Sequence, residues 1–392
     1  MSVGHRTLSV KPSKPYPDFP LFPHATGRWA KKIRGRMVYF GSWADPDAAL
    51  AKYLDQKDAL HAGLTPRADT RQLTVKDLAN DFLNAKQALI DTGELSPRTW
   101  TEYKAAADLI VTTFGKHRLV TDVGTDDFAR LRKRMAQSWG PHRLAKMIQY
   151  IRSVFKHGYD ATLMDRPIRF GPGFNRPSKK TMRLHKAAQG PKLFTADEIR
   201  RVIQAARQPL KAMILLGINC GFGNADCGHL PMTALDLDGG WVNFPRPKTG
   251  INRRCPLWPE TVEAITAALS ARPVPKSAEN ADLVFVTKYG YAWAKDEDPG
   301  VISKEMTKLL RRLGTSGRKG AGFYTLRHTF RTVADAAKDQ PAADFIMGHE
   351  VPHMSAVYRE TISDERLRAV TDHVRTWLFT ESAAKPTAQP AA

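Results

Sequence analysis

The chain has 392 residues, of which 42% are hydrophobic, so it is long enough for two or three packed domains. Its 60 lysines and arginines outnumber its 39 acidic residues and give a net charge of +21, which predicts affinity for a polyanion such as DNA or RNA. We expect a cytoplasmic protein without a metal centre or membrane span, because no apolar run nears the ~20 residues of such a span, no apolar leader is visible, and Cys220, Cys227 and Cys255 lack zinc-ribbon or disulfide spacing.

The chain begins with a Pro-rich segment and a small predicted hairpin. Residues 1–22 lack periodicity, which indicates a flexible arm. Residues 28–33 and 36–41 are typical of two short strands around a tight turn at Arg34-Gly35. Asp45-Pro46-Asp47 then predicts the start of a helix that ends near Ala62. The predicted module covers residues 23–65.

Basic residues of this hairpin are interleaved with aromatic ones. The aromatic residues are Trp29, Tyr39 and Phe40, and the basic ones are Arg28, Lys31, Lys32, Arg34 and Arg36. A small basic hairpin suits a DNA groove, and we favour DNA contact over a merely solvated hairpin packed on the next domain.

Residues 73–165 predict a compact block of four helices after a polar linker. The helices start at Thr74, which can cap with Asp77, at Ser96-Pro97, near Thr125 and near Pro141. Each carries an apolar stripe, which is most simply the core of the block. The outer faces of the four helices are basic, and this repeated bias suggests a duplex partner; the candidate DNA-binding residues are Arg130, Lys133, Arg134, Arg143, Lys146 and Arg152.

A second linker and a mixed domain complete the chain. Residues 166–192 are rich in Pro, Gly, Lys and Arg, and predict a linker long enough to pass around a duplex. The domain at 193–380 opens with a capping box at Thr195–Glu198. Strands are predicted at 241–244, 254–257 and 283–286, with helices dominating afterwards. The Ala/Pro-rich residues 381–392 are expected to be disordered.

Four residues of this domain suggest a site that acts on a phosphodiester. Arg327 precedes His349 by 22 residues, and Tyr358 follows nine residues later. A tyrosine phenolate can attack phosphorus, while an arginine fork and a histidine bind its non-bridging oxygens. Lys248, in the turn Lys248-Thr249-Gly250, can protonate the departing 5′ oxygen. Each residue alone is more often structural, but their order within a basic chain favours the joint interpretation.

These motifs resemble those of the tyrosine recombinases, the family of phage-type integrases. Leu326-Arg327-His328-Thr329-Phe330 resembles the second-arginine box, Gly348-His349 the Leu-Gly-His box, and residues 247–257 the catalytic-lysine hairpin. The resemblance implies a mainly α multidomain fold. It consists of a hairpin-and-helix arm-binding module, a four-helix SAM-like core-binding domain and a mixed α+β DNA breaking-rejoining domain.

Two positions depart from the family pattern. Gly223 stands where the first family arginine should be, and Tyr324 stands where the box has a histidine, although a tyrosine can still bind a phosphate. Losing one charged donor to a developing anion typically costs about 10²–10³ in rate. We therefore expect another cation to compensate, and the candidates are Arg253, Arg254, Arg246 and His229.

The resemblance implies a site-specific DNA recombinase that needs no cofactor. It would join DNA through a 3′-phosphotyrosyl link and a Holliday junction, as a homotetramer on attachment or core sites, with accessory DNA-bending or directionality factors. The helix expected at 362–379 would pack either on a neighbouring protomer or in its own chain. The alternatives are a non-cleaving DNA-binding protein on this scaffold and a type IB topoisomerase.

Overall fold

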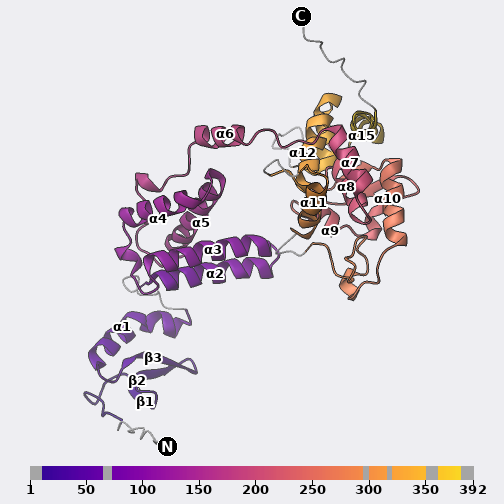
Figure 1. Ribbon diagram of the computed structural model, residues 1–392. Helices are drawn as coiled ribbons and strands as arrows, with labels where there is room; N and C mark the ends of the chain where they lie inside the picture. Colours follow the sequence, from indigo (N-terminus) through magenta and orange to yellow (C-terminus); the bar gives the residue numbers. More distant parts are fainter. Residues whose placement is uncertain (1–10, 65–72, 295–299, 316–319, 350–360, 381–392) are drawn as a thin grey trace, which may run out of the picture. The chain divides into compact units, whose positions relative to one another are not determined.

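The computed structural model describes residues 11–64, 73–294, 300–315, 320–349 and 361–380, and it is mainly helical with two small antiparallel sheets (Figure 1). Its contacts divide the chain into two compact units, Met1–Thr92 with Glu102–Pro177, and Gly93–Thr101 with Ser178–Ala392. No helix in the described ranges is long and apolar enough to cross a membrane.

The N-terminal module is a three-stranded sheet covered by one helix. Strands β1 (Phe22–His24), β2 (Arg28–Ile33) and β3 (Arg36–Ser42) pair antiparallel in that order, and α1 (Pro46–Ala62) packs on them. The β2–β3 hairpin and the helix start at Asp45 confirm the sequence pattern. The first strand was not predicted.

The prediction of a flexible arm over residues 1–22 is wrong for its last residues. Phe19 and Leu21 are fully buried, and the ring of Phe19 contacts that of Trp29 with centroids 5.0 Å apart. The two side chains complete a core of only seven buried residues, so this small module depends on them. The prediction failed because a Pro-rich segment without periodicity can still supply isolated core residues.

The helical domain has the four predicted helices. They are α2 (Val75–Asp91), α3 (Pro97–Phe114), α4 (Thr125–Ser138) and α5 (Pro141–Asp160). Thr74 and Asp77 form the expected capping box, and Gly115 follows α3 with φ +95°. The stripe residues Phe128, Leu131 and Ile151 are fully buried in one core.

The linker prediction for residues 166–192 was wrong over its first part. Phe174, in a 3₁₀ turn at Pro172–Phe174, is fully buried against Phe128 of the helical core, with ring centroids 5.2 Å apart. Arg152 donates from Nη2 to the carbonyl of Phe174, which fixes this segment to α5. Residues Lys179–Ala188 then form α6. One apolar residue among many polar ones decided the packing.

Asp127 holds the start of α4 through a buried ion network. Its carboxylate accepts two hydrogen bonds from Arg118, at 3.0 and 2.7 Å, one from Arg130, and one from the backbone N–H of Gly124. The hydrogen bonds from Arg118 are the main reason why the pKa of Asp127 falls from 3.8 to about 2. The network therefore stabilises the folded state when the carboxyl group of Asp127 is ionised.

Asp127→Asn is expected to destabilise the helical domain by about 2 kcal/mol at pH 7. Because the folded pKa is the lower one, this contribution is complete above about pH 4 and is lost as the pH falls towards 2. Hydrogen exchange of α4 peptides in the whole chain measures the difference. If the stability difference between wild type and Asp127→Asn were the same at pH 7 and at pH 2.5, the stabilising role of the ionised Asp127 would be contradicted.

The C-terminal domain is built around a large apolar core. The helices among its described residues are α7 (Ala196–Ala205), α8 (Leu210–Asn219), α9 (Asn224–Gly228), α10 (Pro259–Ser270), α11 (Gly300–Arg312), α12 (Phe323–Ala334), α13 (Gln340–Met347) and α15 (Asp364–Phe379). Every residue of α8 from Ala212 to Asn219 is buried, so this helix forms the centre of the domain. Cys220, Cys227 and Cys255 are buried free thiols.

A small sheet flanks this helical core. Strands β4 (Leu235–Asp236), β5 (Trp241–Asn243) and β6 (Arg254–Pro256) pair antiparallel, and the β5–β6 hairpin confirms the prediction. Residues 283–286 do not form the predicted strand. Val284, Phe285 and Val286 are buried, but their neighbourhood has only isolated bridges, such as Pro231 to Leu283. The apolar run correctly indicated burial. A β-strand also needs a neighbouring strand to pair with, and the described part of the fold supplies none along these residues.

The final described helix packs within its own chain. Leu367, Val370, Val374 and Leu378 of α15 are buried in the same core as α7 and α12. These contacts lie within one chain, and packing of this helix on a neighbouring protomer in an assembly stays a prediction.

Candidate functional site

Arg327 lies at the centre of the candidate site, on α12. Its neighbours Phe323, Leu326 and Phe330 anchor that helix in the core, and only 2% of Arg327 is exposed. The guanidinium donates from Nη1 to the carbonyl of Gly221 and from Nη2 to that of Met347, at 2.8 Å. Arg327 therefore joins the loop before α9 to the end of α13.

The electrostatic surroundings of Arg327 are strongly positive. Burial is the main reason why the pKa of Arg327 falls to about 10, and the nearby charge of Arg246 lowers it further. Arg253 contributes in the same direction, while Asp226 and Tyr324 oppose it. The guanidinium remains charged at neutral pH. An anion that entered this cluster would relieve the repulsion among its cations.

His349 follows α13 and is oriented by a buried carboxylate. Gly348 ends the helix at φ +60°, a left-handed conformation that favours glycine. The Nδ1 atom of His349 lies 3.3 Å from an oxygen of Asp344, whose backbone carbonyl also accepts from the His349 N–H. Burial, and then the charge of Arg327, lower the pKa of His349. Sequence reasoning missed Asp344, although an acid five residues before the histidine was a usable signal.

The lysine hairpin meets the same loop. Arg246 donates from Nη1 and Thr249 from its hydroxyl to the carbonyl of Gly348, at 3.3 and 3.4 Å. Lys248 is exposed in the turn between these two residues, and Gly250 completes the turn at φ +67°. Residues 347–349 therefore receive contacts from both α12 and the hairpin.

Gly223 precedes α9 and is packed beneath Tyr324. Its backbone N–H donates to Oδ2 of Asp226 at 2.6 Å. A Cβ atom at this position would lie 3.2 Å from that oxygen and 3.3 Å from the ring of Tyr324. Tyr324 itself is about half exposed, and its ring contacts that of His328 edge-on.

The four candidate compensating residues have different positions. Arg253 is buried and pairs with Asp226 at 2.7 Å, and Arg246 contacts Gly348. Arg254 instead forms a double hydrogen bond with Asp364 of α15, at 2.9 Å each, and its guanidinium lies over Trp241. That side chain is thus committed to a different contact. His229 is half-buried after the end of α9, and its role stays a prediction.

Tyr358 lies outside the described residues, so its place relative to this cluster stays a prediction. Among the described residues no group of histidines, cysteines or acids has the arrangement of a metal site.

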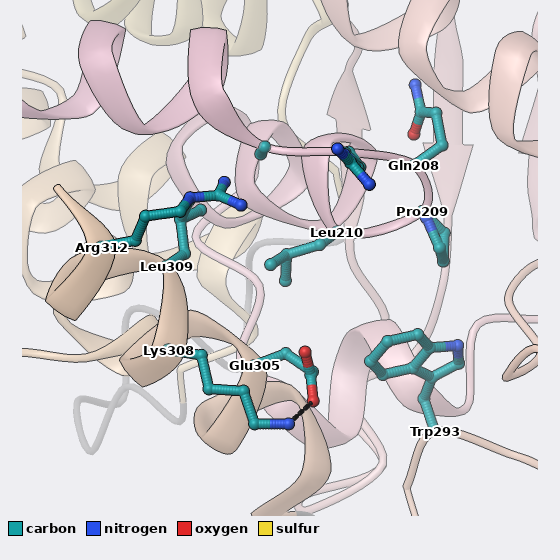
Figure 2. Close-up of a pocket in the computed structure, with 10 residues that line it drawn as sticks. Gln208, Pro209, Leu210, Trp293, Glu305, Lys308, Leu309 and Arg312 are labelled. Carbon is teal, nitrogen blue, oxygen red and sulfur yellow. Dashed lines mark hydrogen bonds and ion pairs between the residues drawn. The ribbon is translucent and has the colours of Figure 1, made fainter.

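A separate concavity of about 370 Å³ lies near the start of α8. Figure 2 shows Leu210 at its centre, Trp293 on one side, and the ion pair of Lys308 with Glu305 below. No predicted site residue lines it. This concavity and the cluster around Arg327 are therefore different places, and the cluster is the better candidate because its charged groups converge.

The basic residues predicted to contact DNA fall into two groups. Six of them are exposed; these are Arg28, Lys32, Arg36, Lys133, Arg134 and Arg143, of which Arg143 lies over the ring of Trp139. The others also hold their own module. Lys31 donates to the Tyr53 hydroxyl, Arg34 to the His61 carbonyl, Arg130 pairs with Asp127, Lys146 with Glu102, and Arg152 holds Phe174.

Comparison with known proteins identifies the family of the C-terminal domain. The model of the phage integrase family matches residues 192–387. A lambda integrase dimer bound to a core site shares 13% identity with a TM-score of 0.55, covering 89% of this chain and 96% of that chain. A lambda integrase tetramer bound to a Holliday junction shares 14% identity with a TM-score of 0.53, covering 89% of this chain and 98% of that chain. The Tn1549 transposon integrase in complex with transposon right end DNA shares 17% identity with a TM-score of 0.54, covering 77% of this chain and 100% of that chain.

A search among curated proteins finds no match. The fold is that of the tyrosine recombinases, a class of DNA-binding proteins that act in DNA recombination. The chain belongs to the phage integrase family, since the family model covers half of it.

Proposed function

We propose that the chain is a site-specific DNA recombinase that integrates or excises a mobile element. The observation that carries this proposal is that Arg327 and the hairpin that contains Lys248 both contact residues 347–348, next to His349. These segments meet there around a positive cluster. A net charge of +21 supports a nucleic-acid backbone as the anion.

The proposed reaction is a transesterification. The phenolate of Tyr358 attacks the phosphorus, the P–O5′ bond breaks, and the departing 5′ oxygen takes a proton from Lys248. Arg327 donates to the non-bridging oxygens, and His349 contacts the same phosphate. The 3′-phosphotyrosyl ester keeps the energy of the backbone bond. A 5′ hydroxyl of a second strand then reverses the step without a nucleotide cofactor.

The assembly is part of the same proposal. Four protomers would hold two duplexes and exchange strands in pairs through a Holliday junction. The helical domain would bind core sites, and the N-terminal sheet would bind a second DNA site, through exposed basic residues such as Arg28 and Lys133. Accessory DNA-bending or directionality factors would assist in the cytoplasm, at the nucleoid.

Covalent trapping tests the proposal. A nicked suicide substrate is built from the direct repeats that flank the gene, and the wild-type chain is expected to give a covalent protein–DNA band. Tyr358→Phe should give none, because it lacks the nucleophile but keeps the ring. DNA binding by both proteins, measured by gel shift, is the control. A chain that binds its site without ever forming the band would contradict the enzyme function.

Gly223 and Tyr324 favour a second candidate, a DNA-binding protein on this scaffold that does not cleave. Binding without a covalent band is the result that selects it. The sequence raised a type IB topoisomerase as a third function. Relaxation of plasmids without sequence preference would select that one.

A further inference from the structure

The absence of an arginine at position 223 leaves a carboxylate free for another partner. Asp226 uses Oδ2 to accept from the Gly223 N–H, and the Tyr324 ring occupies the space beside that glycine. Oδ1 of Asp226 still faces the interior. Because a buried carboxylate needs a cation or several donors, the loss at 223 creates a binding place for an arginine from elsewhere in the fold.

Arg253 takes that place from the β5–β6 hairpin. Its Nη2 donates to Oδ1 of Asp226 at 2.7 Å, and its Nε donates to the carbonyl of Phe244 at 2.6 Å. Its guanidinium carbon lies 4.1 Å from the centre of the Phe222 ring. Only 3% of the residue is exposed. The guanidinium is therefore held in one orientation before any ligand binds, as a preorganised donor must be.

One nitrogen of this guanidinium has no acceptor. Nη1 of Arg253 is buried and makes no hydrogen bond. Buried donors are nearly always paired, so an orphan on a rigid arginine calls for a ligand. Asp226 is shared with the backbone and neutralises only one of three neighbouring guanidiniums, those of Arg253, Arg246 and Arg327.

The side chain of Arg253 borders the candidate site. A Cβ atom at Gly348 would lie 3.5 Å from Cδ of Arg253 and 2.9 Å from Cβ of Arg246. The carbonyl of the preceding residue, Met347, accepts from Arg327. Arg253 thus borders the loop on which the site converges, beside the half-buried Arg246.

We propose that Arg253 replaces the missing family arginine and donates from Nη1 to a non-bridging oxygen of the scissile phosphate, with Asp226 as its anchor. This inference rests on the proposed function. A second guanidinium beside Arg327 would neutralise the charge that grows on the phosphorus oxygens during attack.

The test compares two suicide substrates, one with an ordinary scissile phosphate and one with a methylphosphonate, which lacks a non-bridging charge. Arg253→Ala is expected to slow covalent trapping by about 10²–10³-fold on the ordinary phosphate and by less than about tenfold on the methylphosphonate. The effect is smaller on the methylphosphonate because this neutral group develops less negative charge for Arg253 to stabilise. Arg254→Ala is the matched control, because its partner is Asp364, and it should stay within about twofold of wild type on both substrates.

The outcomes separate this inference from the proposed function. Wild-type trapping with an undiminished Arg253→Ala variant overturns the inference alone, as does an equal loss on both substrates, which marks a purely structural role. Arg253→Lys keeps the charge but cannot bind Asp226 and a phosphate at the same time. On the ordinary phosphate, its trapping rate should therefore stay further below wild type than the rate of Arg253→Ala does on the methylphosphonate. A wild-type chain that traps neither substrate overturns the proposed function itself.

Discussion

Arg327→Ala is expected to lower the rate of covalent DNA trapping by about 10²–10³-fold, because it removes a charged donor from the developing phosphate anion. Arg327→Lys should restore little of this loss. A lysine keeps one charge, but it cannot donate to the carbonyls of Gly221 and Met347 and still present a fork to a phosphate.

Part of the expected loss is structural, and it can be measured separately. Alanine at 327 leaves two buried carbonyls without a donor, which costs about 1–3 kcal/mol for each unpaired group. Thermal unfolding of the whole chain reports this term, while single-turnover trapping at a temperature where both proteins are folded reports the chemistry. Arg375→Ala is the control, because that arginine pairs with Glu260 outside the site. A wild-type trapping rate in Arg327→Ala would refute the assigned role.

Lys248→Ala is expected to slow trapping by about 10²–10⁴-fold on ordinary DNA, the range of general acid catalysis. The lysine is exposed in the turn between Arg246 and Gly250, so the change should leave the fold intact. A substrate with a 5′-bridging sulfur should restore the rate to within about tenfold of wild type. A thiolate is a good leaving group and needs no proton in the transition state.

The comparison of the two leaving groups identifies the acid. Equal losses on oxygen and sulfur would show that Lys248 binds DNA rather than protonates it. Lys276→Ala is a suitable control, since this lysine lies over the ring of Tyr291 and takes no part in the proposed reaction. Arg246→Ala on the same two substrates tests whether the neighbouring guanidinium supplies the proton instead.

Local sequence signals predicted most of the elements. The capping boxes at Thr74 and Thr195 gave correct helix starts, and the β5–β6 hairpin was predicted around its turn. These signals succeed because they are interactions between residues three or four apart. Phe19 and Phe174 were missed for the converse reason: each is an apolar residue in a polar segment, and its burial depends on a distant core.

The sequence by itself predicted the kind of chemistry that we propose. The order of Arg327, His349 and Tyr358 in a strongly basic chain indicated a phosphodiester site, and the family comparison agrees with the fold that this implied. The sequence also located the gap at Gly223. It left four cations as possible substitutes, because spacing along the chain does not tell which way a side chain points.

Only the tertiary structure distinguished Arg253 from Arg254. Successive side chains of an extended strand point to opposite faces, so these neighbours separate completely. Arg254 turns towards Asp364 of α15, while Arg253 turns inward to Asp226, beside Arg327. The partners lie 110 and 27 residues away in the sequence, and folding alone brings them within hydrogen-bonding distance.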